Sequence, residues 1–125
     1  AATGRPRRVG PIDLVATRYG VQIQGATEIA LTKLDVLSYM KEIPVCVQYE
    51  IHGQKTDEFP FTAVVDEAKP VFTTMPGWGC DISGVRKWED LPVEARNYVE
   101  YIEKAIGCRI SYVSVGASRD EYIQR

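Results

Sequence analysis

The strongest constraint on the fold of this chain is a run of apolar residues that recur at helical spacing between Leu91 and Ile106. A helix over this run would gather its apolar side chains on one face, and that face has to be buried. Asp90 precedes the run as a candidate N-terminal cap, and Gly107 follows it as a residue that tolerates the left-handed conformation in which many helices end. The sequence therefore predicts an amphipathic helix packed on a core.

Other segments predict the elements around this helix. Residues 11–24 have apolar side chains at helical spacing, with Pro11 suited to the first turn and Gly25 to the end. Residues 44–60 alternate in the manner of a hairpin that turns at His52-Gly53. Shorter extended segments are expected at residues 28–34, 69–75, 109–115 and 120–125, with the tryptophans of a mostly irregular middle covering the core. The predicted fold class is α/β, a mixed sheet of short strands with a hairpin and two main helices.

Composition and charge exclude several classes of protein. The length of 125 residues suits a single domain, and 45% of the residues are apolar. A formal net charge of −2 argues against wholesale binding to nucleic acid or to an anionic membrane. Cys46, Cys80 and Cys108 are odd in number and far apart, so neither a disulfide framework nor a zinc site is supported. No apolar run approaches the ~18 residues of a membrane span. We therefore predict a cytoplasmic protein that supplies no metal ligand.

The N-terminal residues concentrate arginine and glycine in the segment that holds Thr3, Gly4, Arg5, Arg7 and Arg8. Arginine guanidinium groups bind carboxylate or phosphate through two parallel hydrogen bonds, and a glycine lets backbone N–H groups approach an anion. An anion site and a solvated basic arm both explain this segment. The chain also begins without methionine, in sequence typical of an interior loop, so we expect it to be a fragment.

The stretch "ALTKLDVL" places a lysine and an aspartate inside an otherwise apolar run. Its residues Thr32–Asp35 have the pattern T/N-K-x-D that guanine-nucleotide proteins carry at the end of a strand. There one carboxylate accepts hydrogen bonds from both the N1–H and the 2-amino group of guanine, while the lysine stem covers a face of the base. Asp35 as an ordinary helix cap before "VLSYM" explains the same residues equally well.

A second short segment follows the strand predicted near the C-terminus. In "SVG", Ser114–Gly116, backbone N–H groups could reach a carbonyl oxygen such as O6 of guanine. A simple turn after a strand explains these residues equally well. The neighbouring Tyr112 and Tyr122 are expected to be core or packing residues.

These motifs together resemble the C-terminal part of the adenylosuccinate synthetase family. "TGRPRR", "LTKLDVLS", "MPGW…DISGV", "LP…A…YVE…IE" and "SVG…RD" occur in the family's order and spacing, and the resemblance covers essentially the whole chain. It implies part of a larger P-loop-type ligase fold, homodimeric as a full-length enzyme. It also implies a reaction in which L-aspartate is joined to IMP with hydrolysis of GTP and assistance from Mg²⁺. The products are adenylosuccinate, GDP and phosphate, on the route to AMP.

The resemblance also implies roles for individual residues. The loop that closes on aspartate would comprise Ala1, Ala2, Thr3, Gly4, Arg5, Pro6 and Arg7. Within it, Arg5 would also bind IMP and Arg7 would also bind GTP. The guanine-binding residues would be Lys33, Leu34, Asp35, Ser114, Val115 and Gly116. This chain departs from the family pattern by alanines at the first two positions, by Pro11 where tryptophan is frequent, and by Ala117 where proline is usual.

The family's glycine-rich phosphate loop, "GDEGKGK", does not occur in this sequence. The resemblance places that loop, the catalytic aspartate and histidine and the Mg²⁺ ligands N-terminal to this chain. We therefore expect residues 1–125 to be a C-terminal fragment with no catalytic residue and no activity alone. A stand-alone guanine-nucleotide-binding or regulatory module is the alternative. An RNA-binding domain would require interleaved aromatic and basic residues or a recognisable RNA motif, and the sequence has neither.

Overall fold

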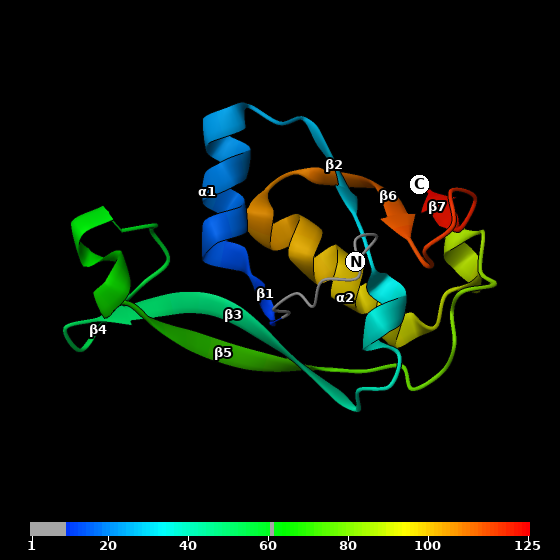
Figure 1. Ribbon diagram of the computed structural model, residues 1–125, viewed down its shortest axis with the longest axis horizontal. Helices are drawn as coiled ribbons and strands as arrows, with labels where there is room; N and C mark the ends of the chain where they lie inside the picture. The colour runs from blue at the N-terminus through cyan, green and yellow to red at the C-terminus, as the bar shows by residue number, and fades with distance from the viewer. Residues whose placement is uncertain (1–9, 61) are drawn as a thin grey trace.

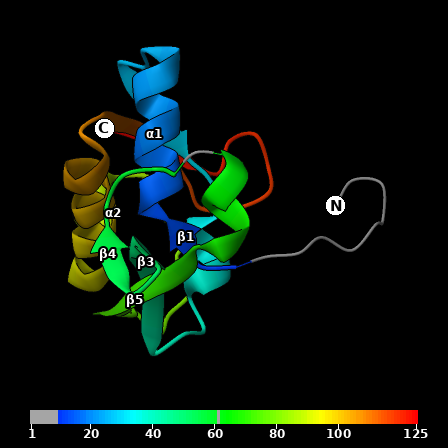
Figure 2. The same cartoon turned by 90° about the vertical axis from the view of Figure 1, so that its left-hand side faces the viewer.

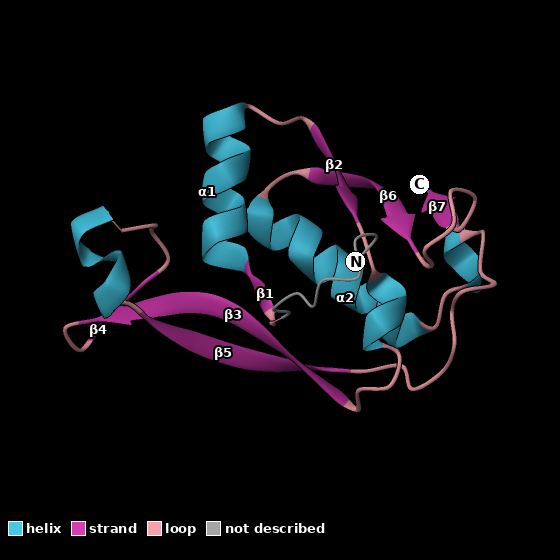
Figure 3. Ribbon diagram, in the orientation of Figure 1, coloured by secondary structure: helices cyan, strands magenta, loops and turns pink. Residues whose placement is uncertain are grey.

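The computed structural model describes residues 10–60 and 62–125 of the chain. Over these residues the chain forms two α-helices, α1 (Leu14–Gln24) and α2 (Val93–Ile106), and seven strands (Figure 1). The α/β class is confirmed. The strands, predicted to form one mixed sheet, belong to two separate sheets, each with parallel and antiparallel pairs (Figure 3).

Helix α1 begins later than predicted, because Asp13 caps it. One carboxylate oxygen of Asp13 accepts a hydrogen bond from the backbone N–H of Ala16 at 3.0 Å, and the other accepts one from the hydroxyl of Tyr49. The residues just before the helix, Ile12–Asp13, form the short strand β1. The predicted end is confirmed, since Gly25 has a φ of 63° and ends the helix in the left-handed conformation.

Helix α2 matches the amphipathic pattern from which it was predicted. Its buried side chains are those of Ala95, Tyr98, Val99, Ile102 and Ile106. Gly107 ends the helix with a φ of 66°, as expected. The predicted cap at Asp90 is wrong: Asp90 ends a short 3-10 helix, Trp88–Asp90, and Pro92 occupies the cap position without a side-chain hydrogen bond. A proline suits the start of a helix because its φ is already restricted to helical values.

The first sheet is built around the long strand β3 (Glu42–Ile51). Strand β5 (Lys69–Pro76) pairs antiparallel along one side of β3, while β1 and β4 (Gln54–Thr56) pair with its other side, β1 in parallel and β4 antiparallel. The predicted hairpin turn is confirmed, and both of its residues, His52 and Gly53, have positive φ values.

The second strand of this hairpin is shorter than predicted. It ends at Thr56, whose hydroxyl accepts a hydrogen bond from the backbone N–H of Glu58 at 3.0 Å. The chain then leaves the sheet, and the ring of Phe59 stacks on Tyr19 of α1 with the ring centroids 4.7 Å apart. A tertiary aromatic contact therefore replaces the strand pairing expected as far as Pro60.

The second sheet consists of β2 (Glu28–Leu31), β6 (Arg109–Ser114) and β7 (Tyr122–Gln124). Strand β6 is central, with β2 parallel on one side and β7 antiparallel on the other. Tyr112 and Tyr122 are 41% and 44% exposed, so they are not core residues. Their rings pack on each other with centroids 5.9 Å apart.

The main hydrophobic core joins α2 to both sheets. Its side chains from the strands include Ile43, Val45, Ile110, Val113 and Ile123. Trp78 belongs to the same core and Trp88 packs against it, as predicted for the tryptophans. In Figure 2, α1 lies above the β3–β5 pair and α2 lies to one side of it. In the described part of the chain, no helix has both the length and the apolar character needed to cross a membrane.

Candidate functional site

The carboxyl ends of β2 and β6 bring together two segments that are far apart in the sequence. The two strands run parallel, with Leu31 opposite Val113. Residues Thr32–Asp35, here named the first loop, and Ser114–Gly116, the second loop, therefore leave the sheet at the same edge (Figure 1). Ligands of α/β folds bind in crevices at this edge of a parallel sheet. The two halves of the predicted guanine site thus lie side by side.

The first loop makes a sharp turn at Lys33. This residue has a φ of 63° and a ψ of 34°, a left-handed backbone conformation that residues other than glycine rarely adopt. The next residue, Leu34, is 1% exposed and belongs to the core. Asp35 follows in the first turn of a short 3-10 helix, Leu34–Leu37, and its side chain is half-buried. The turn thus leaves Lys33 exposed while its neighbour Leu34 is anchored in the core.

The alternative of Asp35 as a helix cap is wrong. The cap position of the 3-10 helix is occupied by Lys33, and no side chain caps this helix by a hydrogen bond. The contribution of Asp35 to the turn is its backbone carbonyl, which accepts a hydrogen bond from the N–H of Ser38 at 3.1 Å. The carboxylate therefore has no capping role here.

A turn from the irregular middle of the chain contacts the segment that follows the first loop, residues 38–41. The indole N–H of Trp78 donates to the hydroxyl of Ser38 at 3.0 Å. The backbone N–H of Gly77 donates to the carbonyl of Lys41 at 2.8 Å. A Cβ atom at Gly77 would lie 1.9 Å from the carbonyl oxygen of Met40, so only glycine fits this approach. The motif "PGW" is therefore the support of the segment that carries Asp35.

The second loop is held by backbone contacts and by one acidic side chain. Val115 is fully buried, and the hydroxyl of Ser114 donates to the carbonyl of Gly116 at 3.0 Å. The carbonyl of Glu121 accepts from the N–H of Val115 at 2.9 Å. The carboxylate of Glu121 accepts from the N–H of Ser118 at 3.0 Å. Glu121 thus contacts the backbone on both sides of Gly116, at Val115 within the loop and at Ser118 beyond it.

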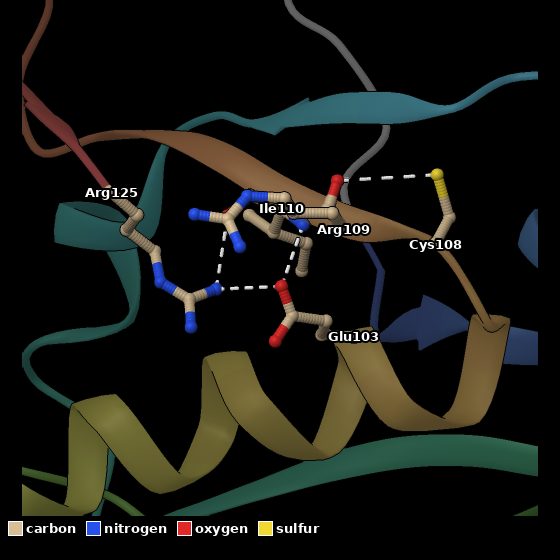
Figure 4. A network of polar contacts seen from close by, with 5 residues as sticks. All are labelled: Glu103, Cys108, Arg109, Ile110 and Arg125. Atoms are coloured by element: carbon tan, nitrogen blue, oxygen red, sulfur yellow. Dashed lines mark hydrogen bonds and ion pairs between the residues drawn. The ribbon is translucent and has the colours of Figure 1, made fainter.

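The opposite end of β6 is tied to α2 by a polar network (Figure 4). Oε2 of Glu103 accepts from the backbone N–H of Ile110 and from Nη1 of Arg125, both at 2.8 Å. The same Nη1 donates to the carbonyl of Ile110 at 2.9 Å, and the Arg125 guanidinium lies 4.2 Å from the ring centroid of Trp88. Burial by itself would raise the pKa of Glu103, but these hydrogen bonds and the positive charges of Arg125 and Arg109 lower it.

The predicted aspartate loop, Ala1–Arg7, lies outside the described residues, so its roles stay predictions. Among residues 10–60 and 62–125, no group of three or more His, Cys, Asp or Glu side chains could hold a metal ion. Two cavities of about 290 and 400 Å³ lie around Arg18 on α1, and neither is lined by a residue of the two loops.

Sequence reasoning identified the two loops but missed the residues that support them. Gly77 was noted only as part of a motif of the resemblance, and Trp78 was expected to cover the core but not to bind Ser38. Ser38 and Glu121 are ordinary polar residues, and no local pattern distinguishes them. Their importance comes from contacts with segments distant in the chain or across a turn.

Comparisons with known proteins identify one family. The family model described as adenylosuccinate synthetase matches residues 1–123. The chain is 49% identical over 123 residues to adenylosuccinate synthetase of Bifidobacterium adolescentis and 50% identical over 123 residues to that of Micrococcus luteus, with 98% of this chain covered in each case. It spans about 29% of the length of these relatives. The solved structure of fully ligated adenylosuccinate synthetase from Plasmodium falciparum is similar with a TM-score of 0.91 and 34% identity, covering 98% of this chain and 30% of that one.

Proposed function

This chain belongs to the adenylosuccinate synthetase family, and on that basis we propose that it is the C-terminal portion of a ligase that joins L-aspartate to IMP at the expense of GTP. The products would be adenylosuccinate, GDP and phosphate. Within that enzyme, the described part of this chain holds the guanine base of GTP. The observation that supports this most strongly is the meeting of the first and second loops at the carboxyl edge of β2 and β6.

The two loops divide the recognition of guanine between them. The carboxylate of Asp35 accepts hydrogen bonds from N1–H and from the 2-amino group. The second loop donates backbone N–H groups to O6. The stem of Lys33 covers one face of the base. The left-handed backbone of Lys33 supports this role, since strained residues are enriched at ligand sites. Leu34 and Val115 contribute by anchoring each loop in the core.

This arrangement favours guanine over adenine. Adenine has no N1–H and no 2-amino group, so it would leave the Asp35 carboxylate without donors beside its own N1 acceptor. A site built around such hydrogen bonds rejects the wrong base by up to ~10⁴-fold, because an unmatched buried polar group is costly. Asp35 is half-buried before any base is bound.

The remaining parts of the reaction involve residues outside the described range. Residues Ala1–Arg7 would close on aspartate, with Arg5 also at IMP and Arg7 shared with GTP. Mg²⁺ would neutralise charge on the transferred phosphoryl group, and its ligands would lie N-terminal to this chain. The complete enzyme would be a cytoplasmic homodimer that needs neither nucleic acid nor membrane.

The substitution Asp35→Asn in the complete protein tests this proposal. It keeps the shape of the side chain but turns one acceptor into a donor, so kcat/KM for GTP should fall. Activity with XTP should rise, because the 2-oxo group of xanthine accepts from the new amide. Asp66→Asn is the matched control, because Asp66 is an exposed aspartate in the short helix Thr62–Glu67. It should leave kcat/KM unchanged for both GTP and XTP.

Two results would contradict the proposal. If folded Asp35→Asn keeps the wild-type ratio of GTP to XTP activity, Asp35 does not contact the base. A complete protein that binds GTP but forms no adenylosuccinate from IMP and aspartate would instead be the non-catalytic guanine-nucleotide module.

A further inference from the structure

We propose that Glu121 is a positioning residue for recognition of the 6-oxo group of guanine. The inference rests on the proposed function, because it concerns the same base. Glu121 would not touch the nucleotide. It would hold the backbone of the second loop in the one conformation that presents N–H groups to O6.

The contacts of Glu121 lie on both sides of the residues that would meet the base. Its backbone carbonyl accepts from the N–H of Val115 at 2.9 Å, and its carboxylate Oε1 accepts from the N–H of Ser118 at 3.0 Å. Its own N–H donates to the carbonyl of Ser118 at 3.0 Å. These contacts use the N–H groups of Val115 and Ser118 and leave those of Gly116 and Ala117 between the two anchors. We therefore assign the contact with O6 to these two backbone N–H groups.

The carboxylate also occupies the space above Gly116. A Cβ atom on Gly116 would lie 2.3 Å from Oε2 and 2.7 Å from Oε1 of Glu121. The missing side chain of the glycine is thus what allows the carboxylate to approach the loop. Gly116 and Glu121 form one unit, in which the glycine gives room and the glutamate restrains the backbone.

Direct recognition of the base by Glu121 is unfavourable on chemical grounds. A carboxylate offers only acceptors, and O6 of guanine is itself an acceptor. The carboxylate can help to bind O6 only by orienting donors that belong to other residues. The hydrogen bond from the N–H of Ser118 to the Glu121 carboxylate does this, because it restrains the end of the segment that contains Gly116 and Ala117.

The test uses the complete enzyme with Glu121→Ala, Glu121→Gln and the control Asp120→Ala. Asp120 is exposed and adjacent in sequence, so its substitution removes the same charge next to the same turn. Glu121→Ala should raise the KM for GTP by about 2- to 10-fold, the effect of one lost hydrogen bond. The KM values for IMP and aspartate should not change. Glu121→Gln should be close to wild type, since its amide oxygen still accepts from Ser118.

A GTP analogue distinguishes positioning from a general structural role. In 6-thio-GTP a sulfur replaces O6, and sulfur is a weak hydrogen-bond acceptor. The contact that Glu121 positions is therefore already weak with this analogue, so Glu121→Ala should raise its KM less than it raises the KM for GTP. If Glu121→Ala does not fold, Glu121→Asp, whose shorter side chain withdraws from Ser118, should give the same pattern.

The outcomes separate the two proposals. A wild-type enzyme that does not use GTP would overturn the proposed function and this inference with it. A GTP-dependent wild type in which Glu121→Ala leaves the KM for GTP unchanged would overturn the inference alone. An equal rise in KM for GTP and 6-thio-GTP would also overturn it, because the effect would then not pass through position 6 of the base.

Discussion

The two loops of the candidate guanine site differ in which of their atoms would contact the base under the proposed function. In the first loop, Thr32–Asp35, these atoms would belong to the side chains of Lys33 and Asp35. In the second, Ser114–Gly116, they would belong to the backbone. Both loops have an apolar anchor, Leu34 in one and Val115 in the other. Each loop is therefore anchored in the core by one apolar side chain, although the proposed contacts with the base differ.

The contacts that support the two loops differ in the opposite sense. The segment that follows the first loop is held by close packing of backbone on backbone, where Gly77 contacts Met40. The second loop is backed by the flexible carboxylate of Glu121 over Gly116. The comparison suggests a rule. A loop that would bind through its side chains can be fixed by a rigid turn packed on the residues that follow it. A loop that binds through its backbone needs partners for the neighbouring N–H groups.

The largest effect on stability is expected from Gly77→Ala, in the turn that packs on the segment following the first loop. The new Cβ would lie 1.9 Å from the carbonyl oxygen of Met40, and a backbone atom cannot move aside without shifting the loop. We expect a loss of about 3 kcal/mol or more in the free energy of unfolding, at the upper end for overpacking. Urea denaturation measures it. Gly84→Ala is the control, because no atom lies within 4 Å of its new Cβ, and an equal loss there would contradict the argument.

Gly116→Ala should have a smaller effect, because the atom in the way is the end of a side chain. The Glu121 carboxylate can turn aside, at the loss of its contact with Ser118, so we expect about 1–2 kcal/mol in stability together with a weaker affinity for GTP. In a Glu121→Ala background the same substitution should cost much less. Additive effects of the two substitutions in this double-mutant cycle would show that glycine and glutamate are independent.

Glu103→Gln tests the polar support at the other end of β6. Hydrogen bonds and positive charge lower the pKa of Glu103 in the folded state, so its ionised form adds stability above the ordinary value of 4.5, and this stability is lost as the pH falls through the lowered pKa. The substitution should cost about 1 kcal/mol at neutral pH and flatten the acid side of the stability profile. Urea midpoints over a pH series measure both effects. Glu100→Gln, exposed on the same helix, should change neither.

The smallest effect, and one of opposite sign, is expected from Lys33→Gly. Glycine adopts the left-handed conformation of this position without strain, so the protein should become more stable by at most about 1 kcal/mol. The affinity for GTP should nevertheless fall, because the lysine stem no longer covers the base. His52→Gly is the matched control, since His52 has a φ of 53° in the hairpin turn. If GTP affinity falls in both variants, the effect of Lys33→Gly does not come from contact of its side chain with the base.

Much of the fold follows from local patterns. The face of α2, the left-handed ends at Gly25 and Gly107, and the hairpin turn at His52-Gly53 depend on the spacing of apolar residues and on backbone freedom. The predicted start of α1 was wrong because the helix begins after its cap Asp13, not at Pro11. The carboxylate of Asp13 caps the backbone N–H of Ala16 locally and also accepts from Tyr49 of a distant strand.

The same division applies to the site. The residues that would contact guanine through side chains, Lys33 and Asp35, could be recognised in the sequence because a four-residue pattern contains all the chemistry. That Asp35 does not cap a helix could not be recognised, because a cap depends on where the turn begins. The turn begins at Lys33, in a backbone conformation that sequence alone does not favour there.

By itself the sequence therefore determined the two helices and the hairpin turn, and it supplied the candidate binding side chains Lys33 and Asp35, since these depend on neighbours in the chain. Only the tertiary structure decided that the strands form two sheets, that β2 and β6 run parallel, and that the two loops emerge at one edge. It also decided the supporting roles of Trp78 and Glu121. The physical reason is that parallel pairing and hydrogen bonds between distant segments depend on the packing of the whole core, which no short stretch of sequence contains.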